Sequence, residues 1–140
     1  MEKYIVFEGP DFTGKSTLIA KLAAYLESKN IISVVTGHPG STEIGQKLRQ
    51  LIKQPDLMAD KHTRAIMLAA DNYEFQKQIA LPLVGSGKWL LADRSNFISS
   101  MAYQLADGIP MADLQKVHDV VVEYRPIDVC FIMDIDYETR

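Results

Sequence analysis

The segment from Gly9 to Ser16 constrains the fold of this chain more than any other. It reads Gly-Pro-Asp-Phe-Thr-Gly-Lys-Ser and fits the pattern G-x-x-x-x-G-K-[ST]. In that pattern the glycines let the backbone curl around an anion, so that successive N–H groups face phosphate oxygens. The apolar run 4–7 before it predicts a buried strand, and the apolar residues behind it, from Leu18 to Leu26, recur at helical spacing. A strand, a glycine loop and a helix in this order predict a nucleotide site, rather than a chance glycine turn.

The residue types inside this loop predict how the nucleotide is held. Lys15 is expected to reach the β- and γ-phosphates, and the Ser16 hydroxyl can ligate Mg²⁺. The N-terminus of the following helix adds partial positive charge. The ATP-binding residues are therefore predicted to be Gly9, Pro10, Asp11, Phe12, Thr13, Gly14, Lys15, Ser16 and Thr17.

Composition excludes several classes of protein. The 140 residues predict one domain, and 47% hydrophobic with 24% charged residues is ordinary for a globular core. The net charge of −3 argues against nucleic acid or an anionic membrane as the main partner. No apolar run approaches the ~20 residues of a membrane span, and the early first strand leaves no room for a signal peptide. The single cysteine, Cys130, lies in the apolar run 129–133, which predicts a buried, unreactive thiol and a cytoplasmic protein.

Strands and helices alternate along the whole chain. After the first helix, the pattern predicts strands at 31–36, 89–92 and 128–133 and helices at 43–52, 60–83, 97–107 and 110–124. The third helix is expected to tolerate a bend at Pro82, and the last is expected to carry Pro110 in its first turn. This alternation predicts an α/β fold with a parallel sheet covered on both faces, whose ligands bind at the carboxyl ends of the strands.

Polar residues follow each predicted strand and should meet at that edge. They are Glu8 to Asp11, Gly37 to Thr42, Asp93 with Arg94, and Asp134 with Asp136. Asp93 and Asp134 both end apolar strands, so position alone does not decide which carboxylate serves Mg²⁺. Arg94 is predicted to face phosphate at this edge, with a local ion pair as the alternative.

Further residues in the sequence could contact a ligand. Leu68 and Asn72 are four residues apart and share a helical face, near which Phe75 also lies, so this face could form the wall of a base pocket. No His/Cys cluster offers a transition-metal site, and no Asn-Lys-x-Asp stretch supports a GTPase. The histidines are predicted to be solvated at His38 and His62 and to occupy a helix face at His118.

Five motifs follow one another over essentially all 140 residues: Phe7 to Thr17, Pro39 to Arg49, Leu68 to Asn72, Asp93-Arg94 with Ser99 to Gln104, and Arg125-Pro126 leading to Asp136. Their order and spacing resemble those of the thymidylate kinases. The resemblance implies a P-loop kinase three-layer sandwich forming a single domain, residues 1–140. It also implies transfer of the ATP γ-phosphoryl group to a deoxynucleoside monophosphate, most directly dTMP to dTDP, with Mg²⁺ and in a homodimer.

The resemblance also assigns roles by position. Lys15 and the loop amides would hold the donor phosphates, Thr17 the α-phosphate, and Ser16 with Asp93 the metal. Lys15, Asp93 and Arg94 would form the catalytic group. Arg49 and Arg94 would clamp the acceptor phosphate. Asp11 would hold the sugar 3′-hydroxyl, and Tyr103 would pack under the deoxyribose. The remaining acceptor-binding residues would be Leu68, Asn72, Ser99 and Ser100.

The chain departs from the family pattern at the base and beside the second strand. The family usually has Phe where Leu68 stands, to stack on thymine, and Arg where Asn72 stands, to hydrogen-bond it. Gly37-His38 stands where Arg-Glu is common. These changes predict looser selection of the base, while leaving the kinase chemistry intact.

Two further departures concern the loops around the reacting phosphate. One extra residue lies between Arg94 and Ser99, which predicts a rearranged turn. Phe12 occupies the loop position where one subgroup has a basic residue, whereas the other subgroup supplies an arginine from its lid. The family continues beyond Tyr137 to Arg140 into a lid and a last strand, so the sequence is expected to lack both and to be nearly inactive alone.

Two other functions remain open from the sequence. One is a kinase of the same architecture for another deoxynucleotide or for a deoxynucleoside, in which Glu8 would be the candidate base. The other is a P-loop nucleotide-binding module that phosphorylates no acceptor. Arg49, Arg94 and Tyr103 favour a kinase, because such a module has no need of a phosphate clamp and a sugar platform.

Overall fold

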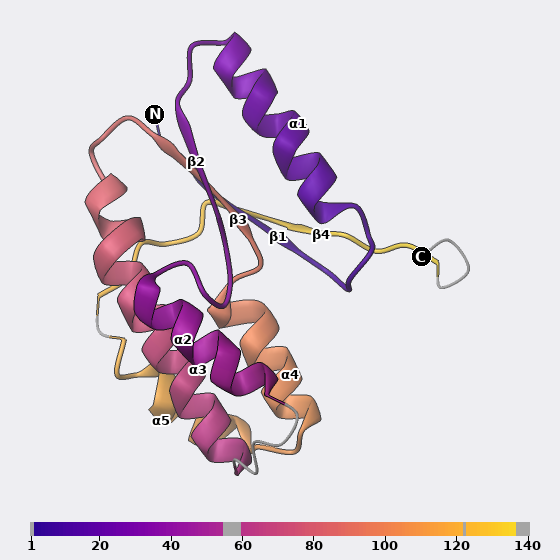
Figure 1. Ribbon diagram of the computed structural model, residues 1–140, viewed down its shortest axis with the longest axis vertical. Helices are drawn as coiled ribbons and strands as arrows, with labels where there is room; N and C mark the ends of the chain where they lie inside the picture. The colour runs from indigo at the N-terminus through magenta and orange to yellow at the C-terminus, as the bar shows by residue number, and fades with distance from the viewer. Residues whose placement is uncertain (1, 55–59, 122, 137–140) are drawn as a thin grey trace.

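The computed structural model describes residues 2–54, 60–121 and 123–136. Within these ranges, strands and helices alternate as predicted (Figure 1). The strands are β1 Tyr4–Glu8, β2 Ser33–Gly37, β3 Trp89–Asp93 and β4 Val129–Ile132. The α-helices are α1 Lys15–Ser28, α2 Glu43–Lys53, α3 Lys61–Phe75, α4 Met101–Ala106 and α5 Met111–His118.

The four strands form one parallel sheet in the order β2-β3-β1-β4. Phe7 is in register with Asp93 on β3, and Gly37 on β2 is paired with Asp93 from the other side. All four carboxyl ends therefore lie at one edge, and the loops that follow them meet there. Because side chains alternate across a strand, each strand also supplies residues to both faces of the sheet.

Each face of the sheet has its own hydrophobic core. On one face, Ile5, Phe7 and Leu91 pack against residues of α1, chiefly Ile19 and Leu26. On the other, strand residues pack against the end of α3 and the turns that follow it: Tyr4, Val6, Leu90 and Ala92 against Phe75 and Ala80. Figure 1 shows α1 on one side of the sheet, whereas α2 to α5 form a group apart from α1. The predicted α/β three-layer architecture is confirmed.

The winding of the helices differs from the sequence prediction at three places. The predicted helix 60–83 is α-helical only to Phe75 and continues as a π-helical turn, η1 (Gln76–Ala80), and a 3₁₀ turn, η2 (Leu81–Leu83), so the change begins before Pro82. Helix 97–107 begins as a π-helical turn, η3 (Asn96–Ser100). The predicted helix 110–124 is shorter in the structure. Pro110 occupies the N-cap position, and α5 runs from Met111 to His118.

The prediction of a buried thiol at Cys130 is wrong. All four residues of β4 are exposed, and Cys130 is exposed among them. β4 is an edge strand, and its apolar contact is the stacking of Phe131 on Phe7, with ring centroids 5.4 Å apart. An apolar run predicts a strand, but whether another layer covers that strand is decided elsewhere in the chain.

Candidate active site

The carboxyl ends of the strands open into a cavity of about 880 Å³. Its walls combine the glycine loop, the segment after β2, the end of β3 and residues of α2, α3, η3 and α4. Of the predicted site residues, the cavity is lined by Asp11, Phe12, Gly14, Lys15, Ser16, Thr17, Arg49, Leu68, Asp93, Arg94, Ser99, Ser100 and Tyr103. The fold thus brings into one cavity predicted site residues that lie up to 92 positions apart, from Asp11 to Tyr103.

Lys15 is held by the loop it belongs to. It begins α1 and is buried, and its Nζ donates to the carbonyl oxygens of Gly9 at 2.9 Å and Pro10 at 2.5 Å. The ammonium group therefore lies over the loop, where phosphate oxygens can replace the two carbonyls as its acceptors. Phe12, at the tip of the loop, is 88% exposed with a φ of 65°.

Gly9 is required by a close approach of the chain. Its φ is 135°, and a Cβ at this position would lie 2.4 Å from the carbonyl oxygen of Met133. Met133 follows β4, and its N–H donates to the Glu8 carbonyl oxygen at 2.7 Å. The glycine therefore serves two purposes, since it allows both the turn of the loop and the passage of the segment after β4.

The metal-binding prediction joins two residues 77 positions apart. The Ser16 hydroxyl donates to Asp93 Oδ2 at 3.1 Å. A hydroxyl and a carboxylate at this distance present the oxygen ligands that Mg²⁺ prefers. The structure also separates Asp93 from Asp134, because only Asp93 lines the cavity. No group of three or more His, Cys, Asp or Glu that could hold a metal occurs among the described residues.

Arg94 lies between two other predicted site residues. Its Nη2 is 2.5 Å from Asp11 Oδ1, and its Nη1 donates to the Tyr103 hydroxyl at 3.3 Å. Desolvation works to lower the pKa of Arg94, but the hydrogen bond to Tyr103 and the charges of Tyr103, Asp11 and Asp93 raise it overall. The guanidinium group is therefore a permanent cation at the edge of the cavity, and the ion pair predicted as the alternative is also present.

The segment after Arg94, where an extra residue and a rearranged turn were predicted, forms the π-helical turn η3. Ser95 caps η3 by accepting from the N–H of Ile98, and η3 then has the wider winding typical of a one-residue insertion. Ser99 donates to Glu8 Oε2, and the Ser95 N–H donates to Glu8 Oε1 at 2.8 Å. The buried Glu8 carboxylate is thus engaged by the turn and is not among the cavity-lining residues.

Leu68 and Asn72, the two residues of the predicted pocket wall, differ in their position relative to the cavity. Leu68 lines the cavity, but Asn72 is only 2% exposed and is not part of its lining. The Asn72 Nδ2 has no hydrogen-bond partner among the described residues. Four-residue spacing places both residues on one helical stripe, but Asn72 lies one turn further along, where α3 is covered.

The prediction that His38 is a solvated loop residue is also wrong. His38 is 5% exposed, and its ring stands edge-on to Phe75 with centroids 4.0 Å apart. The ring Nδ1 lies 3.6 Å from Asp71 Oδ2, and the backbone N–H of His38 donates to the Asp93 carbonyl oxygen at 3.0 Å. The peptide bond between His38 and Pro39 is cis.

Sequence reasoning missed part of the cavity. The residues it did not assign to the site include several basic and polar side chains: Lys53, Lys61, Arg64, Ser95, Gln104 and Asp107. Arg64 lies one helical turn before Leu68, so helical spacing could have identified it. Gln104 follows Tyr103 directly, and the resemblance had already marked that segment. Lys53, Lys61 and Asp107 lie at helix ends, where charged residues are too common to indicate a site.

A glycine loop between a parallel strand and a helix, a lysine over that loop and a serine beside an aspartate define a P-loop α/β nucleotide-binding protein. The family model described as thymidylate kinase matches residues 7–140. The chain belongs to the thymidylate kinase family.

Individual relatives support this assignment. A thymidylate kinase of Caldicellulosiruptor saccharolyticus is 36% identical over 137 residues, which are 97% of this chain and 66% of that protein. One of Nitrosomonas eutropha is 34% identical and covers 95% of this chain and 62% of its own length. The crystal structure of thymidylate kinase from Ehrlichia chaffeensis superposes with a TM-score of 0.81 at 30% identity, covering 95% of this chain and 71% of that one.

The chain spans slightly less than two thirds of the length of these two curated relatives. Tyr137 to Arg140, where the lid was predicted to begin, lie outside the described residues. In the part of the chain that the structure describes, no helix is long and apolar enough to cross a membrane.

Proposed function

We propose that the protein transfers the γ-phosphoryl group of ATP to dTMP, giving dTDP and ADP. The observation that carries this proposal is the arrangement of cations in one cavity. Lys15 lies on the phosphate loop, while Arg49 and Arg94 approach the same cavity from α2 and from the end of β3. A protein that only binds a nucleotide needs the lysine, whereas a kinase also needs cations for a second, accepting phosphate.

On the donor side, Lys15 exchanges its two carbonyl acceptors for oxygens of the β- and γ-phosphates, and the loop N–H groups bind the same phosphates. Thr17 contacts the α-phosphate. Ser16 and Asp93 would hold Mg²⁺, because their two oxygens are already adjacent. When bound, the metal would supply positive charge beside the phosphates.

On the acceptor side, two arginines clamp the phosphate of dTMP, because a guanidinium group can bind two phosphate oxygens at once. Arg49 is oriented by its Nη1, which donates to the Pro39 carbonyl oxygen at 2.6 Å. Arg94 is oriented by Asp11 and Tyr103. Asp11 binds the 3′-hydroxyl, and the Tyr103 ring packs under the deoxyribose.

The base occupies the part of the cavity bordered by Leu68, Ser99 and Ser100. The hydroxyl of Ser99 donates to Glu8 and that of Ser100 accepts from Gln104, so both are positioned before any base arrives. Leu68 offers an apolar surface without an aromatic face. This lining supports acceptance of thymine together with weaker rejection of other bases.

Two observations bear on the alternatives. A deoxynucleoside kinase would need Glu8 free to accept the proton of a 5′-hydroxyl, but the buried carboxylate accepts from Ser95 and Ser99 and does not line the cavity. A module without an acceptor would leave Arg49 and Arg94 without a role. The deciding experiment is a phosphoryl-transfer screen of the common nucleoside monophosphates and deoxynucleosides with the full-length protein. Hydrolysis of ATP without any phosphorylated acceptor would contradict the proposal.

The resemblance also implies a homodimer, and we propose that α2 and α3 form its interface. Each helix carries two exposed apolar residues seven positions apart, Ile44 with Leu51 and Ile66 with Tyr73. Seven residues are two helical turns, so each pair lies on one stripe. Size-exclusion chromatography with light scattering tests this, and a monomer at micromolar concentration would contradict it. A cytoplasmic location stays a prediction.

A further inference from the structure

The buried carboxylate of Asp71 is not used by the chemistry described above. Asp71 is fully buried in the C-terminal part of α3. A buried carboxylate is costly unless several donors or charges surround it. Its surroundings therefore indicate what it stabilises.

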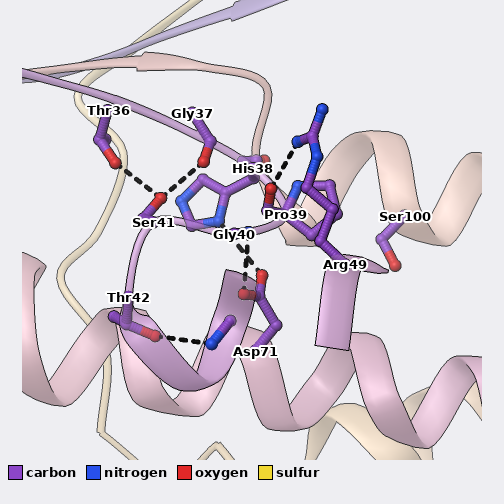
Figure 2. A network of polar contacts seen from close by, with 12 residues as sticks. Thr36, Gly37, His38, Pro39, Gly40, Ser41, Thr42, Arg49, Asp71 and Ser100 are labelled. Atoms are coloured by element: carbon purple, nitrogen blue, oxygen red, sulfur yellow. Dashed lines mark hydrogen bonds and ion pairs between the residues drawn. The ribbon is translucent and has the colours of Figure 1, made fainter. Parts of the chain in front are cut away.

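Figure 2 shows that Asp71 points at the segment after β2. Its Oδ1 accepts from the Gly40 N–H at 3.0 Å, and its Oδ2 lies 3.6 Å from His38 Nδ1. The start of α2 approaches it equally closely, because a Cβ on Gly45 would lie 2.2 Å from Oδ1. Only glycine at position 45 permits this approach, which places the carboxylate beside the positively polarised N-terminus of α2.

The same segment is fixed at several other points. The Ser41 hydroxyl donates to the Gly37 carbonyl oxygen at 2.6 Å, and the Thr36 hydroxyl donates to Ser41 Oγ at 2.7 Å. Thr42 caps α2 by accepting from the Gly45 N–H at 3.0 Å. These contacts are local, whereas Asp71 is 31 residues away from Gly40 and joins the segment to a different helix.

Arg49 lies on the opposite side of this segment from Asp71. It donates to the Pro39 carbonyl oxygen at 2.6 Å, and its Cδ would be 2.9 Å from a Cβ on Gly40 (Figure 2). Residues 38–40 are thus enclosed between the carboxylate on α3 and the guanidinium group on α2. A displacement of Gly40 moves Pro39, and with it the acceptor that orients Arg49.

We propose that Asp71 is a positioning residue for the acceptor-phosphate clamp, acting through the Gly40 amide and the Pro39 carbonyl oxygen on Arg49. This inference rests on the proposed function, because it concerns the binding of the accepting phosphate. Asp71 does not touch the substrate. Its effect is expected on the acceptor side, because its contacts with the Gly40 amide and with His38 lie on the segment after β2.

The main test measures steady-state kinetics of Asp71→Ala in the full-length protein. The loss of a charge-assisted hydrogen bond to Gly40 is expected to raise the KM for dTMP roughly 10-fold or more, with the KM for ATP changed less than about 2-fold. Gln76→Ala is the matched control, because Gln76 is also buried, directly after α3, and its Oε1 accepts from the Arg125 N–H at 2.9 Å, away from the clamp. It is expected to lower the melting temperature without changing the KM for dTMP.

A double-mutant cycle shows whether Asp71 acts through Arg49. In an Arg49→Ala background, Asp71→Ala should raise the KM for dTMP by less than about 2-fold, because the oriented group is already absent. Fully additive effects would overturn the proposal. So would an Asp71→Ala variant that raises both KM values equally.

Asp71→Asn covers the case in which Asp71→Ala does not fold. It keeps the volume and an oxygen acceptor but gives a weaker, neutral hydrogen bond, so a smaller rise in the KM for dTMP, about 3-fold, is expected. If Asp71→Ala does not fold and Asp71→Asn leaves the KM for dTMP unchanged, the proposal is overturned.

Amide hydrogen exchange separates this proposal from the proposed function. Without any nucleotide, Asp71→Asn and Asp71→Ala should both increase exchange of the Gly40 amide relative to the wild type and to Gln76→Ala. Unchanged protection of Gly40 refutes the positioning role even if dTMP is phosphorylated. Increased exchange in a protein that phosphorylates no monophosphate would retain the structural link and refute the kinase function.

Discussion

Replacing Arg94 by alanine tests the acceptor side of the proposed reaction most directly. The side chain is only 18% exposed, and its guanidinium group is fixed by Asp11 and Tyr103. Alanine keeps the Cβ, so the backbone at a φ of 71° gains no new steric strain. The substitution therefore removes the cation without an added cost in the loop.

The size of the expected loss depends on the hydrogen bonds that the phosphate gains from Arg94 and on the Arg94–Asp11 ion pair that it displaces. A hydrogen bond to a charged group contributes about 1.5–3 kcal/mol, and a forked contact makes two such bonds. The phosphate must compete with the Asp11 carboxylate, which is 79% exposed, so that this existing pair contributes only about 0–1 kcal/mol. The net loss is about 3 kcal/mol, and kcat/KM for dTMP should fall by roughly 10²-fold.

The assay follows ADP release while dTMP and ATP are varied separately. Arg94→Lys is the matched variant, because it keeps the charge but loses the fork, and it should lose about 10-fold. ATP binding, measured by calorimetry, should change much less than dTMP binding in both variants. Equal losses of ATP and dTMP affinity would place Arg94 on the donor phosphates and refute this reasoning.

Three further outcomes are expected. Lys15→Ala should remove detectable transfer, because the loop has no other cation for the β- and γ-phosphates; a variant with most of its turnover would refute the donor site. Because Leu68 offers no aromatic face and Asn72 lies outside the cavity, a monophosphate screen should show discrimination for dTMP well below ~10⁴. A preference of ~10⁴ for dTMP over every other base would contradict this prediction. Gly9→Ala should lower the melting temperature more than Gly14→Ala, since only the former meets backbone atoms; equal losses in thermal unfolding would show that backbone strain alone matters.

Much of the fold could be predicted because its information is local. The phosphate loop is determined by eight consecutive residues, Gly9 to Ser16, whose own N–H groups and lysine provide the contacts. The strands and helices follow from apolar spacing, and their alternation implies parallel strands with their carboxyl ends together. That rule predicts that Asp93 and Arg94 lie at this edge of the sheet.

Burial could not be predicted in the same way, because it depends on residues distant in the sequence. His38 has the neighbours of a loop residue, yet Phe75 and Asp71 from α3 enclose it. Cys130 has the neighbours of a core residue, yet it lies on an edge strand that is exposed in the described structure.

The sequence by itself therefore determined the phosphate loop, the order of the elements and the edge at which the polar residues meet. Only the tertiary structure decided which of those residues share a cavity: it brought Ser16 to Asp93, excluded Asp134 and Asn72 from the lining, and engaged Glu8 with η3. It also joined Asp71 to the segment that orients Arg49. The physical reason is that hydrogen bonds along a helix or a loop connect near neighbours, whereas a cavity is formed where segments with no local relation pack against one another.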